Sequence, residues 1–124
     1  MRLDKLTIKA QEAMQDGFDL AERLNHQQVD NEHLLLALLN QKEGFLGEVL
    51  ASLGVNTASL SRKINEELNN RAKVYAKTSG VHLSSDLNNT LRSAQEQAKQ
   101  LGDEFISVEH LFLALAEDKE GFHA

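Results

Sequence analysis

One long internal repeat limits the folds that this chain can adopt. At an offset of 77 residues, EHLLLALLNQKEGF (residues 32–45) aligns with EHLFLALAEDKEGF (residues 109–122), and 10 of the 14 positions are identical. Composition alone would give about one identity in such a window. The match continues upstream in residue type, over the pairs Leu6 with Leu83, Thr7 with Ser84, Met14 with Leu91, Ala21 with Ala98, Leu24 with Leu101 and Val29 with Ile106. We therefore interpret the chain as a duplication of one structural unit.

Both units are predicted to be helical. Apolar residues recur with the 3.6-residue period of an amphipathic helix, and the absence of proline favours uninterrupted helices. Side chains that commonly cap helices precede these segments, namely Thr7, Asp30 and Thr57 in the first unit and Ser84 or Ser85 and Ser107 in the second. The helix after Ser84 is expected to bury Leu87, Leu91, Ala94, Ala98 and Leu101. The predicted fold class is all-α, a pseudo-twofold duplication of a four-helix unit.

The repeat also predicts how the chain is organised. We assign repeat one to residues 1–70, a polar connector to residues 71–82, and repeat two to residues 83–124, together one domain. Repeat one continues for about 25 residues after its matched block, whereas the sequence ends two residues after Phe122. We therefore expect the second repeat to be incomplete.

Composition excludes several classes of protein. The chain has 13 basic and 19 acidic residues, a formal charge of −6, and its basic residues are scattered. Nucleic acid and anionic membranes are therefore not expected as partners, because proteins that bind them cluster Lys and Arg. The sequence lacks an apolar run of the roughly 18 residues that a membrane span needs, and it has no apolar signal segment. We expect a cytoplasmic protein.

No catalytic or cofactor motif is found in the sequence. Cysteine is absent, which excludes disulfides and thiolate metal sites, and the glycines form no phosphate-binding loop. His33 and His110 follow glutamates but lack the second histidine of a zinc-binding HExxH motif. We expect both to be residues at helix starts, hydrogen-bonded by backbone or water, with metal binding as the alternative. The segment is predicted not to be an enzyme and to hold no cofactor.

Two hydroxyl–glutamate pairs are candidates for a polar binding site. Thr7 precedes Glu32 by 25 residues, and Ser84 precedes Glu109 by 25. One interpretation is structural, because a carboxylate in the first turn of a helix is stabilised by the helix dipole. The other is functional: helix N-termini offer N–H groups to an anion, and a glutamate can bind a guanidinium through both oxygens. Two related pockets for a ligand of mixed charge would then result.

Exposed apolar residues are the second class of candidates. Phe105 follows Gly102 and Asp103 in a predicted turn, and its counterpart in the first repeat is the polar Gln28. An aromatic residue is therefore not required there by the duplicated core. It serves either to bind a partner or to close its own helix pair as a hydrophobic staple. Weaker candidates are Ile8, Leu91 and Val108.

The segments MRLDKLTIKAQEAM, EHLxLALxxxKEGF and GDEFISVEHL together resemble the Clp N-terminal domain, in particular that of ClpB-type disaggregase chaperones. The resemblance implies an all-α recognition domain joined to ATPase modules, which bind ATP outside this chain and assemble as a homohexamer in stress-responsive proteins. It implies binding of unfolded or aggregated polypeptides through an apolar groove with polar flanks. The matching positions are Thr7, Asp103 and Glu109, and Phe105 and Leu91 complete the predicted groove.

ClpC-type and ClpA-type protease-coupled unfoldases share this domain plan and provide the alternative function. In ClpC-type relatives, the resemblance implies pockets that dock adaptor proteins or read phosphorylated arginine. The matching positions are Thr7, Glu32, Ser84 and Glu109. The predicted function is accordingly substrate recognition for a disaggregase, with adaptor docking or phosphoarginine reading as the alternative.

Overall fold

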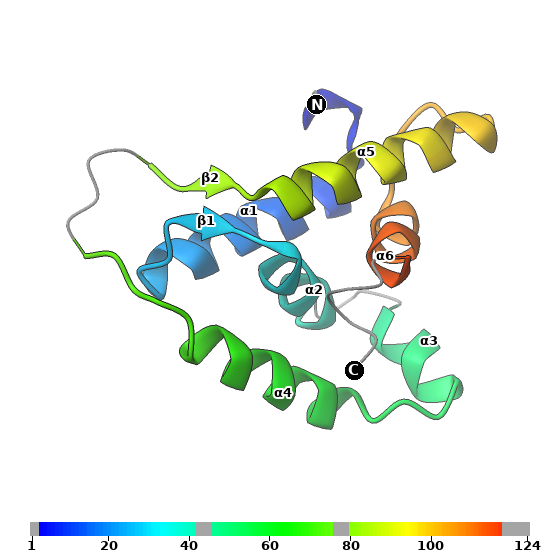
Figure 1. Ribbon diagram of the computed structural model, residues 1–124. Helices are drawn as coiled ribbons and strands as arrows, with labels where there is room; N and C mark the ends of the chain where they lie inside the picture. Colours follow the sequence, from blue (N-terminus) through cyan, green and yellow to red (C-terminus); the bar gives the residue numbers. More distant parts are fainter. Residues whose placement is uncertain (1–2, 42–45, 76–79, 118–124) are drawn as a thin grey trace.

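A computed structural model describes residues 3–41, 46–75 and 80–117 of the chain. It confirms the predicted all-α fold class (Figure 1). In the described residues, the only strands are two segments of two residues each. In chain order the elements are η1 (Leu3–Lys5), α1 (Ile8–Arg23), β1 (Gln28–Val29), α2 (Asn31–Leu39), α3 (Leu46–Ser52), α4 (Thr57–Asn69), β2 (His82–Leu83), α5 (Ser85–Gln100) and α6 (Val108–Ala116).

Side-chain caps start the helices where the sequence predicts them, with one exception. The Thr7 hydroxyl accepts a hydrogen bond from the Ala10 N–H at the start of α1, and the Ser84 hydroxyl accepts one from Leu87 at the start of α5. The cap of α4 is Asn56 and not Thr57, so that prediction is wrong. Asparagine is as strong an N-cap as threonine, and the extended backbone at position 56 lets its side chain reach the first turn.

The core is built around α2. Every residue from Asn31 to Leu38 is buried, as expected for a helix that is apolar around most of its circumference. The helix contacts α1, α3, α4, α5 and α6, and Figure 1 shows it in the middle of the molecule with α4 on one side and α5 on the other. α6 is its counterpart in the second repeat but is less covered: Leu113 is exposed, whereas the equivalent Leu36 is buried among α2's neighbours.

The two repeats exchange backbone hydrogen bonds reciprocally. The Thr7 N–H donates to the Ile106 carbonyl over 2.9 Å, and the Ser84 N–H donates to the Val29 carbonyl over 2.9 Å. Both pairs are related by the offset of 77. The residues before Thr7 and Ser84 pair in parallel with Ile106 and Val29, the latter pairing being that of β1 with β2. Such an exchange places the repeats about an approximate two-fold axis, as the duplication predicts.

One predicted core position is wrong. Leu101 is exposed, because α5 ends at Gln100 and the chain turns away at Gly102, whose φ is +76°. The equivalent turn in the first repeat uses Asn25 at φ 61°. The helical period therefore stops one residue earlier than the sequence pattern suggests.

Both histidines in the repeated motif complete capping boxes. The Asp30 N–H donates to His33 Nδ1 over 2.8 Å, and the Ser107 N–H donates to His110 Nδ1 over 2.9 Å. The prediction that these histidines are helix-start residues bonded to backbone is confirmed. Because Nδ1 accepts a proton donor in each ring, the ring proton is on Nε2.

The other ring nitrogen has a different partner in each repeat. His33 Nε2 lies 2.8 Å from His26 Nδ1, and His110 Nε2 lies 3.0 Å from Asp103 Oδ2. His26 and Asp103 are equivalent positions at the offset of 77. Burial, together with the neighbouring His26 and Arg71, lowers the pKa of His33 to about 4. The first repeat thus contains a contact between two buried histidines, in which His33 is neutral at pH 7.

This pair predicts a loss of stability in weak acid. The folded-state pKa of His33 is about 4 and the unfolded value is about 6.5, so the unfolded chain binds the extra proton between these pH values. We expect the free energy of unfolding to fall by about 3 kcal/mol across that window because of His33. Urea denaturation over a pH series measures this. His33→Gln, which preserves the capping box, should flatten the profile, whereas His82→Gln at an exposed histidine should not. Equal slopes in all three proteins would contradict the assignment.

Two glycines predict opposite effects on stability. Gly17 lies inside α1, and a Cβ there would be 3.7 Å from the backbone of His33 and Leu34, an ordinary contact distance. Gly17→Ala should therefore raise the free energy of unfolding by about 1 kcal/mol, since alanine is the better helix former. Gly102→Ala should lower it by about 1 kcal/mol because of the positive φ. Urea denaturation of both variants tests the pair, and destabilisation by Gly17→Ala would contradict the described fit of α1 on α2.

Candidate functional site

The reciprocal exchange gathers the predicted polar residues into two related sites. The first acidic site consists of Asp30, Glu32 and Ser84, and the second acidic site of Thr7, Ser107 and Glu109. In each, the N-cap of one long helix lies against the start of a short helix from the other repeat. The expected pairing of Thr7 with Glu32 and of Ser84 with Glu109 is therefore wrong in its partners, because the two-fold arrangement exchanges them.

The first acidic site holds the guanidinium of Arg71. Arg71 Nη2 lies 2.8 Å from Glu32 Oε1, and Nη1 lies 3.1 Å from Asp30 Oδ2. The Ser84 hydroxyl donates to the other Asp30 oxygen over 2.8 Å. The planar fork of an arginine is well suited to bridging two carboxylates in this way. The site therefore binds a guanidinium from the connector of its own chain.

Both charges of this ion pair are partly removed from water. Glu32 is only 6% exposed, and burial raises the pKa of its carboxyl, although its own backbone N–H and Arg71 work in the opposite direction. Burial alone lowers the pKa of Arg71, but Glu32 and then Asp30 outweigh it and raise the pKa above the ordinary value. Removing either partner would leave the other charge poorly solvated.

The second acidic site has the same framework without a bound cation in the described residues. Thr7 caps α1 and lies beside Ile106 through its backbone bond, and Ser107 caps α6. Glu109 is exposed, and none of the side chains described in the structure forms a hydrogen bond or ion pair with its carboxylate. The two sites thus differ in two ways: a guanidinium occupies only the first, and the second has Ser107 where the first has the carboxylate of Asp30.

Of the remaining predicted residues, Asp103 and Phe105 lie in the loop between α5 and α6, and Leu91 lies on α5. Phe105 is 45% exposed, and Asp103 is exposed while it accepts a hydrogen bond from His110 Nε2. Leu91 is only 1% exposed and belongs to the core, so the expectation that it contributes to a surface groove is wrong. It lies on the inner face of α5, where the helical period alone places it.

Exposed apolar residues occur in the segments next to Phe105. Ile8 and Leu101 are also exposed, and Ile8 follows the Thr7 residue whose backbone bonds to Ile106, next to Phe105 in the chain. Beside this loop is a mainly apolar cavity of about 220 Å³, lined by Lys5, Gln95, Ala98, Lys99, Asp103, Glu104 and Ile106. We call Ile8, Leu101 and Phe105, with Asp103 at their edge, the Phe105 surface.

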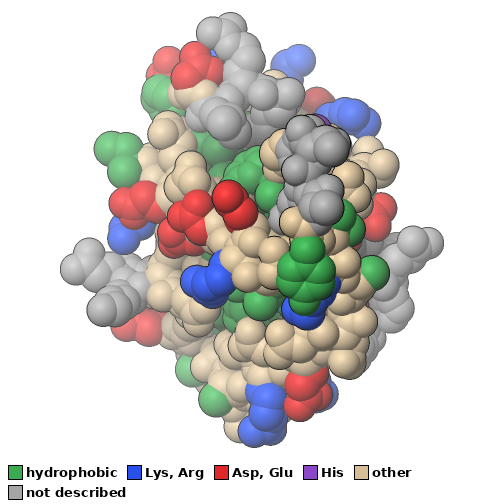
Figure 2. Space-filling model, turned by 90° about the vertical axis from the view of Figure 1, so that its left-hand side faces the viewer, with side chains coloured by type: hydrophobic (Ala, Val, Ile, Leu, Met, Phe, Trp, Pro, Cys, Tyr) green, Lys and Arg blue, Asp and Glu red, His purple; other side chains and the backbone are tan. Residues whose placement is uncertain are grey.

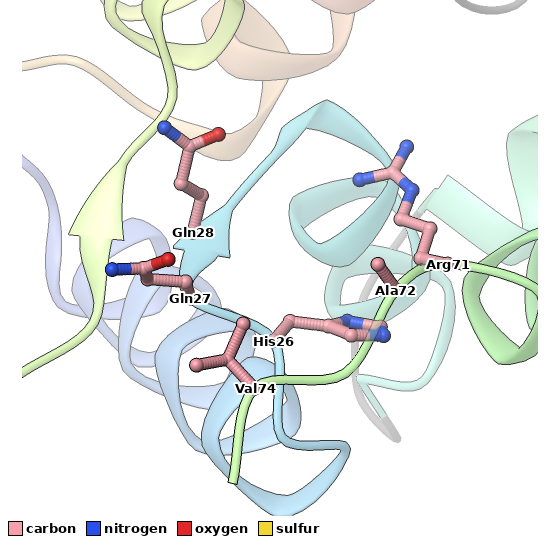
Figure 3. Close-up of a pocket in the computed structure, with 6 residues that line it drawn as sticks. All are labelled: His26, Gln27, Gln28, Arg71, Ala72 and Val74. Carbon is pink, nitrogen blue, oxygen red and sulfur yellow. The ribbon is translucent and has the colours of Figure 1, made fainter. Parts of the chain in front are cut away.

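A second cavity lies between the connector and β1 (Figure 3). Its volume is about 330 Å³, and it is lined by His26, Gln27, Gln28, Arg71, Ala72 and Val74. In Figure 3 the guanidinium of Arg71 points away from the His26 ring. The lining offers amide and aliphatic groups, and Gln28 stands where the second repeat has Phe105.

The scattered charges are predictable from the sequence, but the contact of Arg71 with Asp30 and Glu32 is not. Figure 2 shows acidic and basic side chains interspersed on the face at the left of Figure 1, with hydrophobic ones in separate small groups. Arg71 was expected only to be part of a polar connector, and Asp30 only to be a cap. The single hint was one arginine beside lysines in a segment that follows repeat one.

None of the helices described in the structure has the length and apolarity to cross a bilayer.

The chain matches the Clp repeat (R) N-terminal domain family over residues 5–124. Chaperone protein ClpB of Clostridium perfringens is 39% identical over 98% of the chain, which spans 14% of that relative's length. The Hsp104 N-terminal domain of Candida albicans superimposes with a TM-score of 0.85 at 20% identity, over 92% of this chain and 75% of that one. A ClpV N-domain solved in complex with a VipB peptide gives a TM-score of 0.74 at 20% identity, over 90% of this chain and 68% of that one.

These likenesses agree with the geometry. The solved N-domains share the fold, and the ClpB relative shares the sequence over nearly the whole chain. The family predicted from the opening segment and the repeated motif is confirmed. With its two helical repeats joined by reciprocal backbone bonds, the chain belongs to the Clp repeat (R) N-terminal domain family.

Proposed function

We propose that this chain is the substrate-recognition domain of a ClpB-type protein disaggregase. It binds segments of unfolded or aggregated polypeptide weakly and passes them to an ATP-driven ring formed by other parts of the protein. The observation that carries this proposal is the exposure of three apolar side chains, Ile8, Leu101 and Phe105, on segments that the Thr7–Ile106 backbone bond and the loop with Asp103 connect. Unfolded chains expose apolar side chains, which a surface of this kind can cover.

The proposal assigns the chemistry of the whole protein to segments outside this chain. This domain catalyses nothing and holds no cofactor, ATP is bound and hydrolysed by ATPase modules, and the full protein works as a cytoplasmic homohexamer. The likeness to ClpB over 98% of the chain supports this assignment. The ClpV N-domain bound to a VipB peptide supports a peptide as the type of ligand.

The surface also suggests which peptides bind best. Asp103, Glu104 and Glu109 place carboxylates on and around the loop that bears Phe105, and all three are exposed. The chain as a whole carries a charge of −6. Peptide segments that combine an apolar side chain with Lys or Arg therefore complement it, by burial at Phe105 and by charge at the rim. Binding is expected to be micromolar or weaker, since a flexible peptide loses conformational entropy and the surface is small.

Replacing Phe105 tests this function. Phe105→Ala should weaken binding of a permanently unfolded protein, such as reduced and carboxymethylated α-lactalbumin, by about tenfold, because the apolar contact is lost. The measurement is a titration followed by amide chemical shifts, with the largest changes expected at Asp103 and Phe105. Tyr75→Ala is the matched control, since Tyr75 is 75% exposed but lies in the connector. Equal affinity in the wild type and both variants would reject the Phe105 surface as the binding site.

A second candidate function is favoured by the contacts of Arg71. We infer that the two acidic sites are suited to arginine side chains, including phosphorylated arginine, on substrates or adaptor proteins. The first site already holds a guanidinium between Asp30 and Glu32. In the second, Glu109 can bind the guanidinium, while the Thr7 hydroxyl and nearby helix N–H groups can bind the phosphate.

Phosphoarginine is the probe for this candidate. We expect it to shift the amide signals of Thr7 and Glu109, and Glu109→Gln should weaken the response by about tenfold through loss of the charge-assisted bonds. Glu104→Gln removes the same charge from an exposed position nearby and should leave the affinity within about twofold. If both variants weaken binding equally, the response reflects general electrostatics and not a guanidinium site.

A further inference from the structure

The two acidic sites share one framework but differ in occupancy. Each combines the N-cap of a long helix with the first turn of a short helix, and each contains a glutamate at the same repeat position. In the first site both carboxylates contact Arg71, whereas Glu109 of the second site has no partner among the described side chains. Two residues make the difference: Arg71 of the connector occupies the first site, and Asp30, which contacts it, is replaced by Ser107 at the equivalent position of the second site.

We propose that Arg71 is an internal plug of the first acidic site, which closes that site to the guanidinium groups of other molecules. This inference rests on the guanidinium-binding function proposed above and adds a regulation to it. The bound group is the same chemical class as the external ligand, and it contacts the two carboxylates that such a ligand would use. The domain then offers one open guanidinium site although its sequence encodes two.

The geometry lets the plug move without unfolding the connector. The Val74 N–H donates to the Asn25 carbonyl over 2.7 Å, and Lys73 Nζ lies 3.4 Å from the Leu24 carbonyl. These contacts hold the chain next to Arg71 independently of its guanidinium. The Arg71 side chain is 28% exposed, so it has a path to solvent by rotation of its own bonds. An external guanidinium can therefore compete with it.

Tethering explains why the plug would win against weak ligands. Arg71 is attached a few residues from α4 and is held by Val74, so its effective concentration at the site is on the order of millimolar or higher. A free guanidinium ligand must be present above this effective concentration to displace Arg71 from the first acidic site. A ligand that adds a phosphate gains contacts at the helix N-terminus that Arg71 cannot make.

The experiment titrates phosphoarginine into the wild-type chain, Arg71→Ala and Arg62→Ala, following amide shifts at both sites. In the wild type we expect shifts at Thr7 and Glu109 of the second site. In Arg71→Ala we expect additional shifts at Glu32 and Ser84, with an affinity at the first site at least about tenfold above that of the wild type. Arg62→Ala removes an arginine from an exposed position of α4 that contacts neither acidic site, and it should leave the first site closed.

Further variants test whether the result comes from loss of the plug and not from a change in folding. Circular dichroism establishes that each variant is folded. Arg71→Lys retains a cation but not the bidentate fork, so it should open the first site to an intermediate degree. In the double variant with Arg71→Ala and Glu32→Gln, the buried charge is removed together with its partner. That variant should not bind phosphoarginine at the first site.

The outcomes separate this inference from the function on which it rests. Shifts at the second site with none at the first in Arg71→Ala, or equal affinity at the first site in wild type and Arg71→Ala, would overturn the plug and leave the proposed function standing. An opened first site with a silent second site would support the plug and reject the second site. No response at either site in any variant would overturn both.

Discussion

The reciprocal backbone exchange between the repeats is the interaction on which the rest of the structure depends. Thr7 bonds to Ile106 and Ser84 bonds to Val29, so each repeat contributes a strand-like segment to the other. These bonds bring the capped starts of α1 and α5 next to the starts of α6 and α2. Without the exchange, the first acidic site would lose the hydroxyl of Ser84 and the second that of Thr7.

The sequence alone predicts local features such as helix caps, but it does not predict which distant residues contact one another. The caps at Thr7, Asp30, Ser84 and Ser107 were predictable, because a cap is set by residues within one turn. The fold class and the two-fold arrangement followed from the helical period and the offset of 77. The contact of Arg71 with Asp30 spans 41 residues and depends on how the connector returns over the first repeat. Local propensity carries no information about such a contact.

The structure differs from the sequence-based expectations at two leucines and in the pairing of the hydroxyl groups. Leu91 follows the helical period and lies in the core, so its interpretation as an exposed apolar residue of a binding groove is wrong. Leu101 falls outside the helix because Gly102 ends it in the left-handed region. Thr7 and Ser84 lie next to the short helix of the other repeat, and this pairing depends on how the two repeats pack together, which local sequence does not determine.

The repeats have kept their geometry while their chemistry has diverged. His26 and Asp103 are equivalent and both contact the repeated histidine, yet one makes a buried histidine–histidine contact and the other a carboxylate–imidazole contact. Gln28 and Phe105 are likewise equivalent, and only the second is apolar. The shared backbone bonds tolerate such changes because they do not involve side chains.

The position of Arg71 outside the duplicated unit has a consequence for valency. Under the proposed plug, the number of ligand groups that one domain engages depends on a single residue of the connector, Arg71. When several copies are displayed together, one or two attachment points per copy lead to very different avidity for a client that carries many arginines. Gene duplication provides a second guanidinium site, and the connector residue Arg71 determines whether that site is accessible to other molecules.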